Sequence, residues 1–211
     1  MCIRDRDEAL KAKERVAKFN LDGFVINAEV NAKNKPAETR AYVNGLAGIG
    51  VPVGLSTYRY PTLHRELDYK TFLEVCDFGM PQVYWVSAIN AGSQLSRSLD
   101  EWRALTDLPI IPTGAAYSER GWTAQPSEVI DFMQTAISLK LDAVNFWVWK
   151  HAVNLGLWDY IAQFPWPSAE TPIPPISPLP QMPDDIGVKI DVPDKDTGVS
   201  VKYHGRINKV V

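Results

Sequence analysis

The stretch LDGFVINAE, from Leu21 to Glu29, combines a turn signal with a short apolar run and ends on a carboxylate. Residues 23–29 are expected to form a buried β-strand, because aromatic and β-branched residues directly follow an Asp-Gly turn pair. Side chains alternate along a strand, so Val25, Asn27 and Glu29 would share one face. Glu29 would then lie at the carboxyl end of the strand.

Helix-like and strand-like segments alternate after this stretch, and a helical pattern precedes it. Strands are predicted at 23–29, 51–58, 82–88, 109–115 and 143–149, and helices at 7–19, 36–48, 69–76, 98–105, 125–141 and 155–164. This α/β alternation predicts parallel strands joined by right-handed crossovers. The spacing fits a (β/α)8 barrel, in which ~250 residues make eight units of about 31 residues each. A complete five-stranded flavodoxin-like sheet is the alternative, but no glycine-rich phosphate turn follows the first strand.

The remaining segments suggest a partial barrel followed by other elements. Residues 7–167 are expected to be the C-terminal part of a TIM barrel, about five βα units, with three units before them. Residues 168–183 are expected to form a proline-rich linker, and residues 184–211, which alternate like a β-hairpin, are expected to begin a truncated β module. Residues 1–6 resemble a translated sequencing adapter at the start of metagenomic gene fragments, so they are expected to be an artefact; a frayed, charged helix start is the alternative. The chain is therefore expected to be a gene fragment.

Composition excludes several classes of function. The net charge is −3 and no block of Lys and Arg occurs, which argues against a nucleic-acid partner. No run of 18 apolar residues is present, so no membrane span is expected. Cys2 and Cys76 are the two cysteines, too few for a disulfide framework and without the spacing of a metal site. We expect no metal and no organic cofactor, and the sequence leaves the oligomeric state undetermined.

LDGFVINAE resembles the DGxDxDxE strand of family-18 glycoside hydrolases, the chitinases and their relatives, and is similar to the acidic strand end of family-25 lysozymes. Asp22, Gly23 and Glu29 keep the chitinase pattern, whereas Val25 and Asn27 replace its inner aspartates. The resemblance implies a middle strand of a TIM barrel with Glu29 as general acid. Asn27 can hydrogen-bond to a substrate, but it lacks the charge that would stabilise a positive intermediate.

Two further segments resemble the same family. QVYW at 82–85 is similar to the MxYD motif, and the resemblance makes Tyr84 the tyrosine that contacts the substrate acetamide, with Trp85 in place of the aspartate. AVNFWVW at 143–149 resembles the last barrel strand, whose inward tryptophan forms the floor of a sugar site. Either Trp147 or Trp149 would fill that role, because both share strand parity with Asn145.

Aromatic residues near strand ends suggest a sugar-binding face, because flat rings with polar edges suit the C–H faces of pyranoses. The candidate substrate-binding residues are Tyr58, Trp85, Tyr117, Trp147, Trp149 and His151. The alternative places many of these rings in the core. Glu119, in a loop beside Arg120, is expected to form a surface ion pair.

The sequence thus predicts a glycoside hydrolase-like domain acting on an N-acetylhexosamine polysaccharide of the peptidoglycan or chitin type. Glu29 would protonate the glycosidic oxygen, while Asn27 and Tyr84 would orient the substrate. The alternative is a non-catalytic glycan-binding barrel of a cell-wall or phage-particle protein, which the missing inner aspartates favour. A linker and an appended module are typical of secreted enzymes, so an extracellular or cell-wall location is expected.

Overall fold

The computed structural model describes residues 6–167 of the 211-residue chain. The expected linker at 168–183 and the expected hairpin in 184–211 lie outside the described residues, as do residues 1–5 of the expected artefact. Arg6 is the first residue of helix α1.

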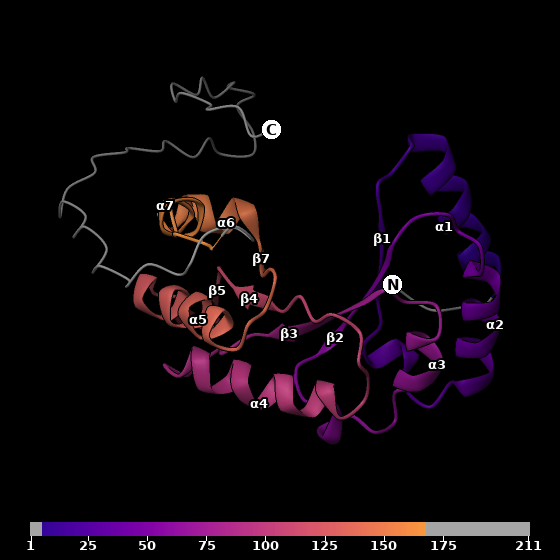
Figure 1. The fold of residues 1–211 in the computed structure, drawn as a ribbon, viewed down its shortest axis with the longest axis horizontal. Coiled ribbons are helices and arrows are strands. Elements are labelled where there is room, and N and C mark those ends of the chain that lie inside the picture. The colour runs from indigo at the N-terminus through magenta and orange to yellow at the C-terminus, as the bar shows by residue number, and fades with distance from the viewer. Residues whose placement is uncertain (1–5, 168–211) are drawn as a thin grey trace. The chain divides into compact units, whose positions relative to one another are not determined.

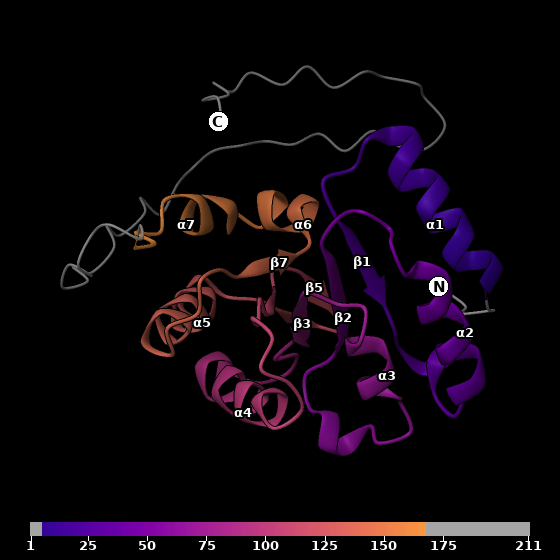
Figure 2. The ribbon, with the colours of Figure 1, turned by 45° about the vertical axis from the view of Figure 1, so that its right-hand side comes forward.

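The described residues form a mixed α/β fold around a curled, parallel sheet that makes a half-barrel (Figures 1 and 2). The strands of the sheet are β1 (Phe24–Asn27), β2 (Val53–Tyr58), β3 (Phe78–Val83), β4 (Thr113–Ala115) and β7 (Asn145–Trp147). Their spatial order is β1-β2-β3-β4-β7, and each pairs in parallel with its neighbour. The predicted sequential order of parallel strands is therefore confirmed. A flavodoxin-like sheet is excluded, because its strands lie in the order 2-1-3-4-5 and not in sequential order.

Helices follow the strands and lie in an arc around the sheet (Figure 2). They are α1 (Arg6–Phe19), α2 (Pro36–Leu46), α3 (Tyr69–Leu73), α4 (Ala91–Arg103), α5 (Pro126–Ser138), α6 (Trp149–Asn154) and α7 (Trp158–Ala162), with short 3₁₀ turns η1 (Val30–Ala32) and η2 (Pro61–Leu63). Helix α1 packs on α2, and α4 packs on α5. Pro36 and Pro126 each occupy a first helical turn, where a missing N–H costs no helical hydrogen bond.

The core lies between the sheet and these helices, so the two faces of the sheet differ. On β1, Ile26 and the following Ala28 are completely buried, whereas Val25 is 42% exposed and Asn27 is exposed. The predicted alternation of side chains along this strand is thus confirmed. We call the face that carries Val25 and Asn27 the open face of the sheet.

The third strand differs from its predicted bounds of 82–88, because it runs over Phe78–Val83. Gly79 and Pro81 disfavour a strand in isolation, which hid the start of β3 in the sequence. In the folded chain, a Cβ atom at Gly79 would lie 2.6 Å from the Trp102 ring, so only glycine allows helix α4 this close. Tyr84 therefore follows the strand instead of lying within it.

One helix prediction and one further strand prediction also had wrong bounds. Helix α4 begins at Ala91, with Asn90 at the N-cap, whereas the sequence suggested a start at Ser98. Ser98 lies buried in mid-helix, where its Oγ donates to the Arg59 carbonyl at 2.7 Å. At the end of the sheet, β7 stops at Trp147 and a helix begins at Trp149, where the sequence predicted one continuous strand to 149.

A short hairpin that the sequence analysis missed follows β4. Its strands are β5 (Ser118–Glu119) and β6 (Trp122–Thr123). Arg120 and Gly121 between them both have positive φ angles, of 48° and 80°, as a tight hairpin turn requires. The predicted surface ion pair is confirmed, because Arg120 Nε lies 3.5 Å from Glu119 Oε1 and both side chains are exposed.

Candidate functional site

The parallel register brings polar side chains together at the carboxyl edge of the open face. Asn27 pairs with Ser56 across β1 and β2, and Tyr58 pairs with Gln82 across β2 and β3. Because each strand runs in the same direction, Glu29, two residues beyond Asn27, lies at the same edge. This edge is where barrel enzymes place their reactive groups.

Gln82 connects these side chains. Its Nε2 lies 3.0 Å from Asn27 Oδ1, 3.0 Å from Glu29 Oε1 and 3.2 Å from Ser56 Oγ. A side-chain amide nitrogen carries two hydrogens, so the three oxygens share two donors. The structure therefore joins two of the predicted catalytic residues, Asn27 and Glu29, through a third residue that the sequence analysis did not select.

Two phenol groups, of Tyr58 and Tyr84, lie close enough to Glu29 to feel its charge. Burial raises the pKa of the Tyr84 hydroxyl, with smaller contributions from Tyr117 and from the negative charge of Glu29. Burial also raises the pKa of Tyr58, and the charges of Glu29 and Glu66 add to that rise. The rings of Tyr84 and Tyr117 meet edge to face, with centroids 5.6 Å apart. Both Tyr58 and Tyr84 thus remain neutral near Glu29, as groups that donate or accept hydrogen bonds.

A second polar group lies beside Tyr58. The His64 ring stacks on the Tyr58 ring with centroids 3.6 Å apart, and Lys33 Nζ lies 2.9 Å from His64 Nδ1. Lys33 Nζ also lies 4.9 Å from the centroid of the Tyr58 ring and 3.7 Å from Glu66 Oε2. Glu66 is thus paired with a cation. We call Lys33, Tyr58, His64 and Glu66 the lysine–histidine cluster.

The predicted aromatic residues occupy different environments. Trp147 ends β7 and is 57% exposed, while Trp149 is 63% exposed and belongs to helix α6, so strand parity does not apply to it. Trp149 meets Trp158 edge to face at 6.5 Å. His151 is also exposed on α6. Trp147 thus lies at the carboxyl end of β7, and Trp149 and His151 follow it.

Trp85 lies in the core instead of on the open face. Its side chain is completely buried, packs against Phe132 of α5 with ring centroids 5.3 Å apart, and donates Nε1–H to Glu128 Oε2 at 3.2 Å. A predicted contact between Trp85 and substrate does not fit this position, because no part of the ring reaches the surface. Tyr117 is half-buried and packs between Tyr84 and Trp122.

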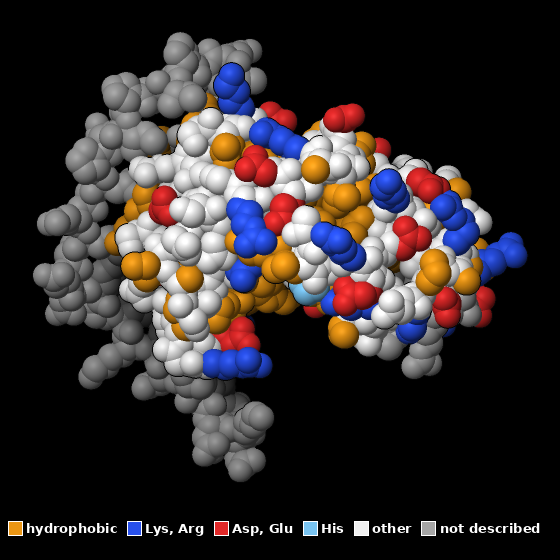
Figure 3. Space-filling model, turned by 90° about the horizontal axis from the view of Figure 1, so that it is seen from below, with side chains coloured by type: hydrophobic (Ala, Val, Ile, Leu, Met, Phe, Trp, Pro, Cys, Tyr) orange, Lys and Arg blue, Asp and Glu red, His pale blue; other side chains and the backbone are white. Residues whose placement is uncertain are grey.

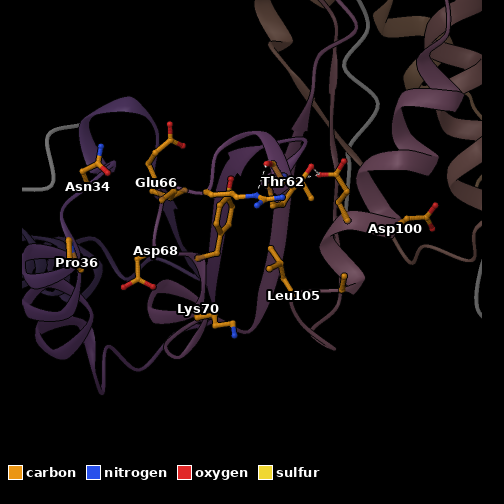
Figure 4. Close-up of a pocket in the computed structure, with 14 residues that line it drawn as sticks. Asn34, Pro36, Thr62, Glu66, Asp68, Lys70, Asp100 and Leu105 are labelled. Carbon is orange, nitrogen blue, oxygen red and sulfur yellow. Dashed lines mark hydrogen bonds between the residues drawn. The ribbon is translucent and has the colours of Figure 1, made fainter.

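Another hollow of the described residues lies away from these side chains, on the outer side between α3 and α4. It is a groove of about 820 Å³, and neither Glu29 nor Gln82 lines it. Figure 3 views this side and shows hydrophobic side chains in the hollow with charged side chains along its margins. In Figure 4, Thr62 lies in the groove, where Glu101 Oε2 accepts from both its N–H and its hydroxyl at 3.0 and 2.7 Å. None of the predicted catalytic residues lines this groove, so we place the candidate chemistry at the open face.

Sequence reasoning missed Gln82 and Ser56. The signal was strand parity: once β3 is placed at 78–83, Gln82 falls on the same face as Asn27. Placing the strand at 82–88 put Gln82 at its start, away from the carboxyl edge.

Comparison with protein-family models and with curated proteins finds no match for the chain. Within residues 6–167, no group of three or more His, Cys, Asp or Glu side chains is arranged to hold a metal ion. No helix in this part of the chain combines the length and apolar character needed to cross a bilayer.

Proposed function

We propose that residues 7–167 are five βα units of a TIM barrel from a glycoside hydrolase-like domain. The sequential parallel order and the curl of the sheet support this assignment, because three further strands would close such a half-barrel. The proposed substrate is an N-acetylhexosamine polysaccharide of the peptidoglycan or chitin type, and an extracellular or cell-wall location goes with it.

The observation that supports this function best is the position of Glu29. It lies at the carboxyl edge of the open face, and its Oε1 accepts from Gln82 at 3.0 Å. This contact leaves Oε2 for the proton that a general acid transfers to the glycosidic oxygen. Asn27 and Tyr84 would orient the substrate group beside the reacting carbon, and the exposed Trp147 ring would contact the sugar face.

A non-catalytic glycan-binding barrel is the second candidate, and one observation favours it. In the described part of the chain, the hydrogen-bond partner of the Glu29 side chain is an amide, and the neighbouring position on the open face is Asn27. Hydrolases with two carboxylates place the second within roughly 5–9.5 Å of the first. An amide in that place retains hydrogen bonding to a sugar but supplies neither a nucleophile nor a base.

Replacing Glu29 by Gln in the full chain tests the proposal. Glu29→Gln keeps the shape and removes the transferable proton, so hydrolysis of chitin or peptidoglycan oligomers should fall by about 10²–10⁴-fold while binding persists. Glu14→Gln, on the exposed face of α1, is the matched control and should leave hydrolysis unchanged. Binding without hydrolysis in the wild-type chain would select the glycan-binding candidate. Absence of both binding and hydrolysis would refute both candidates.

A further inference from the structure

The amide of Gln82 has a fixed orientation. Three oxygens, from Asn27, Glu29 and Ser56, lie within 3.2 Å of its Nε2. A carboxylate oxygen only accepts hydrogen bonds, and Glu29 Oε1 still accepts when a proton sits on Oε2. Turning the Gln82 amide around would place its own oxygen against these three oxygens. The carboxylate of Glu29 therefore sets which end of Gln82 faces the cluster.

The orientation of Gln82 in turn sets that of Asn27. Asn27 Oδ1 is the end that accepts from Gln82, so the Asn27 Nδ2 group is directed elsewhere. Within residues 6–167, Nδ2 has no hydrogen-bond partner, and the side chain is exposed on the open face. Asn27 thus presents N–H donors to a ligand. An aspartate at this position would present only acceptors while ionised.

We propose that Gln82 is a positioning residue, which holds Asn27 as a hydrogen-bond donor and so makes the open face select ligands with a carbonyl oxygen beside Glu29. In the glycan of the proposed function, that oxygen belongs to the N-acyl group of an amino sugar. The choice of glycan rests on the proposed function. The hydrogen bonds that join Glu29 to Gln82 and Gln82 to Asn27, which we call the relay, are observed independently of that function. Donation from Asn27 to an acyl oxygen is one hydrogen bond, which contributes a preference of about two- to tenfold in affinity.

Two trisaccharides with the same β-1,4 linkage test the selection. The full chain is titrated with chitotriose, which carries N-acetyl groups, and with cellotriose, which carries none. The wild type should bind chitotriose about two- to tenfold more tightly than cellotriose. Gln82→Met keeps the length of the side chain and removes the donor, so the preference should be lost while cellotriose affinity stays the same. Gln163→Met, at an exposed position after α7, is the control and should keep the preference.

The side-chain amide signals of the full chain, in ¹⁵N-edited NMR spectra, test the relay without any ligand. The Gln82 NH₂ protons should exchange slowly with water in the wild type, and Glu29→Met, which removes the acceptor oxygen and keeps the length of the side chain, should speed that exchange. Gln82→Met should change the Asn27 NH₂ signals, whereas Gln163→Met should not. Should Gln82→Met misfold, Glu29→Met alone decides the relay from the Gln82 signals.

Different results would overturn the relay and the proposed function. Unchanged Asn27 and Gln82 signals in the folded variants would overturn the relay. Altered signals with no binding of either sugar would overturn the proposed function and keep the relay. If Asn27→Leu keeps the preference for chitotriose, the donor role of Asn27 is wrong, because the leucine side chain has nearly the same shape and cannot form hydrogen bonds.

Discussion

His64 makes the stability of the folded chain depend on pH. Burial lowers the pKa of its imidazole, and the nearby charge of Lys33 lowers it further, against a smaller opposing effect of Glu66. The unfolded chain, with an ordinary histidine pKa near ~6.5, therefore binds a proton more readily than the folded chain does. Stability from the lysine–histidine cluster is present above that pH and decreases as the pH falls through this range.

Urea unfolding at pH 7.5 and pH 5.0 measures this dependence. His64→Phe keeps a ring stacked on Tyr58 and removes the titrating nitrogens, so the variant should lose less free energy of unfolding between the two pH values than the wild type. His151→Phe, exposed on α6, is the matched control and should keep the pH dependence of the wild type. An equal loss in wild type and His64→Phe would show that His64 does not titrate as described.

Single residues at the site were predictable where strand parity held. Asn27 follows the predicted parity of β1, and Ile26 is buried beside it, because one face of the strand packs against helices. The same reasoning failed for Trp149, since the strand ends two residues earlier and a helix begins. Gln82 was missed because the start of β3 was hidden, so its strand parity pointed to no site. Its importance comes from register with Tyr58 and from contacts to residues more than 20 positions away in sequence.

At the scale of the elements, the contact between α4 and α5 depends on Gly92. Its N–H donates to Asp131 Oδ2 at 2.7 Å, and a Cβ atom there would lie 2.3 Å from Thr135 Oγ1 and 2.8 Å from Asp131 Oδ1. Gly92→Ala should therefore lower the free energy of unfolding by about 1–3 kcal/mol, the usual cost of overpacking. Chemical denaturation measures this loss.

Two variants test the cause of that loss. Adding Thr135→Ala to Gly92→Ala removes the closest atom and should restore part of the stability. Gly23→Ala is the control, because its Cβ would meet no atom closer than 3.4 Å, and its stability should stay near that of the wild type. If the double variant is no more stable than Gly92→Ala, the close approach of Thr135 is not the cause.

Helices with a clear period and a proline start were predictable, and elements held by tertiary contacts were not. Pro36 opens α2 and Pro126 opens α5, close to the expected starts. The first turns of α4 contain Gly92 and no acidic residue, so the sequence pointed to Ser98 instead. The start of β3 was hidden in the same way, since Gly79 is favourable only because Trp102 packs against it.

At the scale of the whole molecule, the half-barrel has two edge strands, β1 and β7. Neither has a second partner strand among residues 6–167, so each presents unpaired backbone N–H and C=O groups. Val25 adds an apolar side chain, 42% exposed, on the open face of β1. Unpaired parallel strands with exposed apolar side chains promote association between chains. We therefore expect the chain to self-associate as its concentration rises.

A charge on the open face of β1 tests this expectation, because a lysine that points inward on an edge strand would bury its charge if another strand paired there. Val25→Lys should shift the concentration at which the chain self-associates upward by several-fold, as measured by light scattering coupled to size-exclusion chromatography. Val30→Lys, in the exposed turn η1 outside the sheet, adds the same charge and should have a smaller effect. Equal shifts in the two variants would assign the effect to net charge. A wild-type chain that stays monomeric at every concentration would mean that these edges do not drive association.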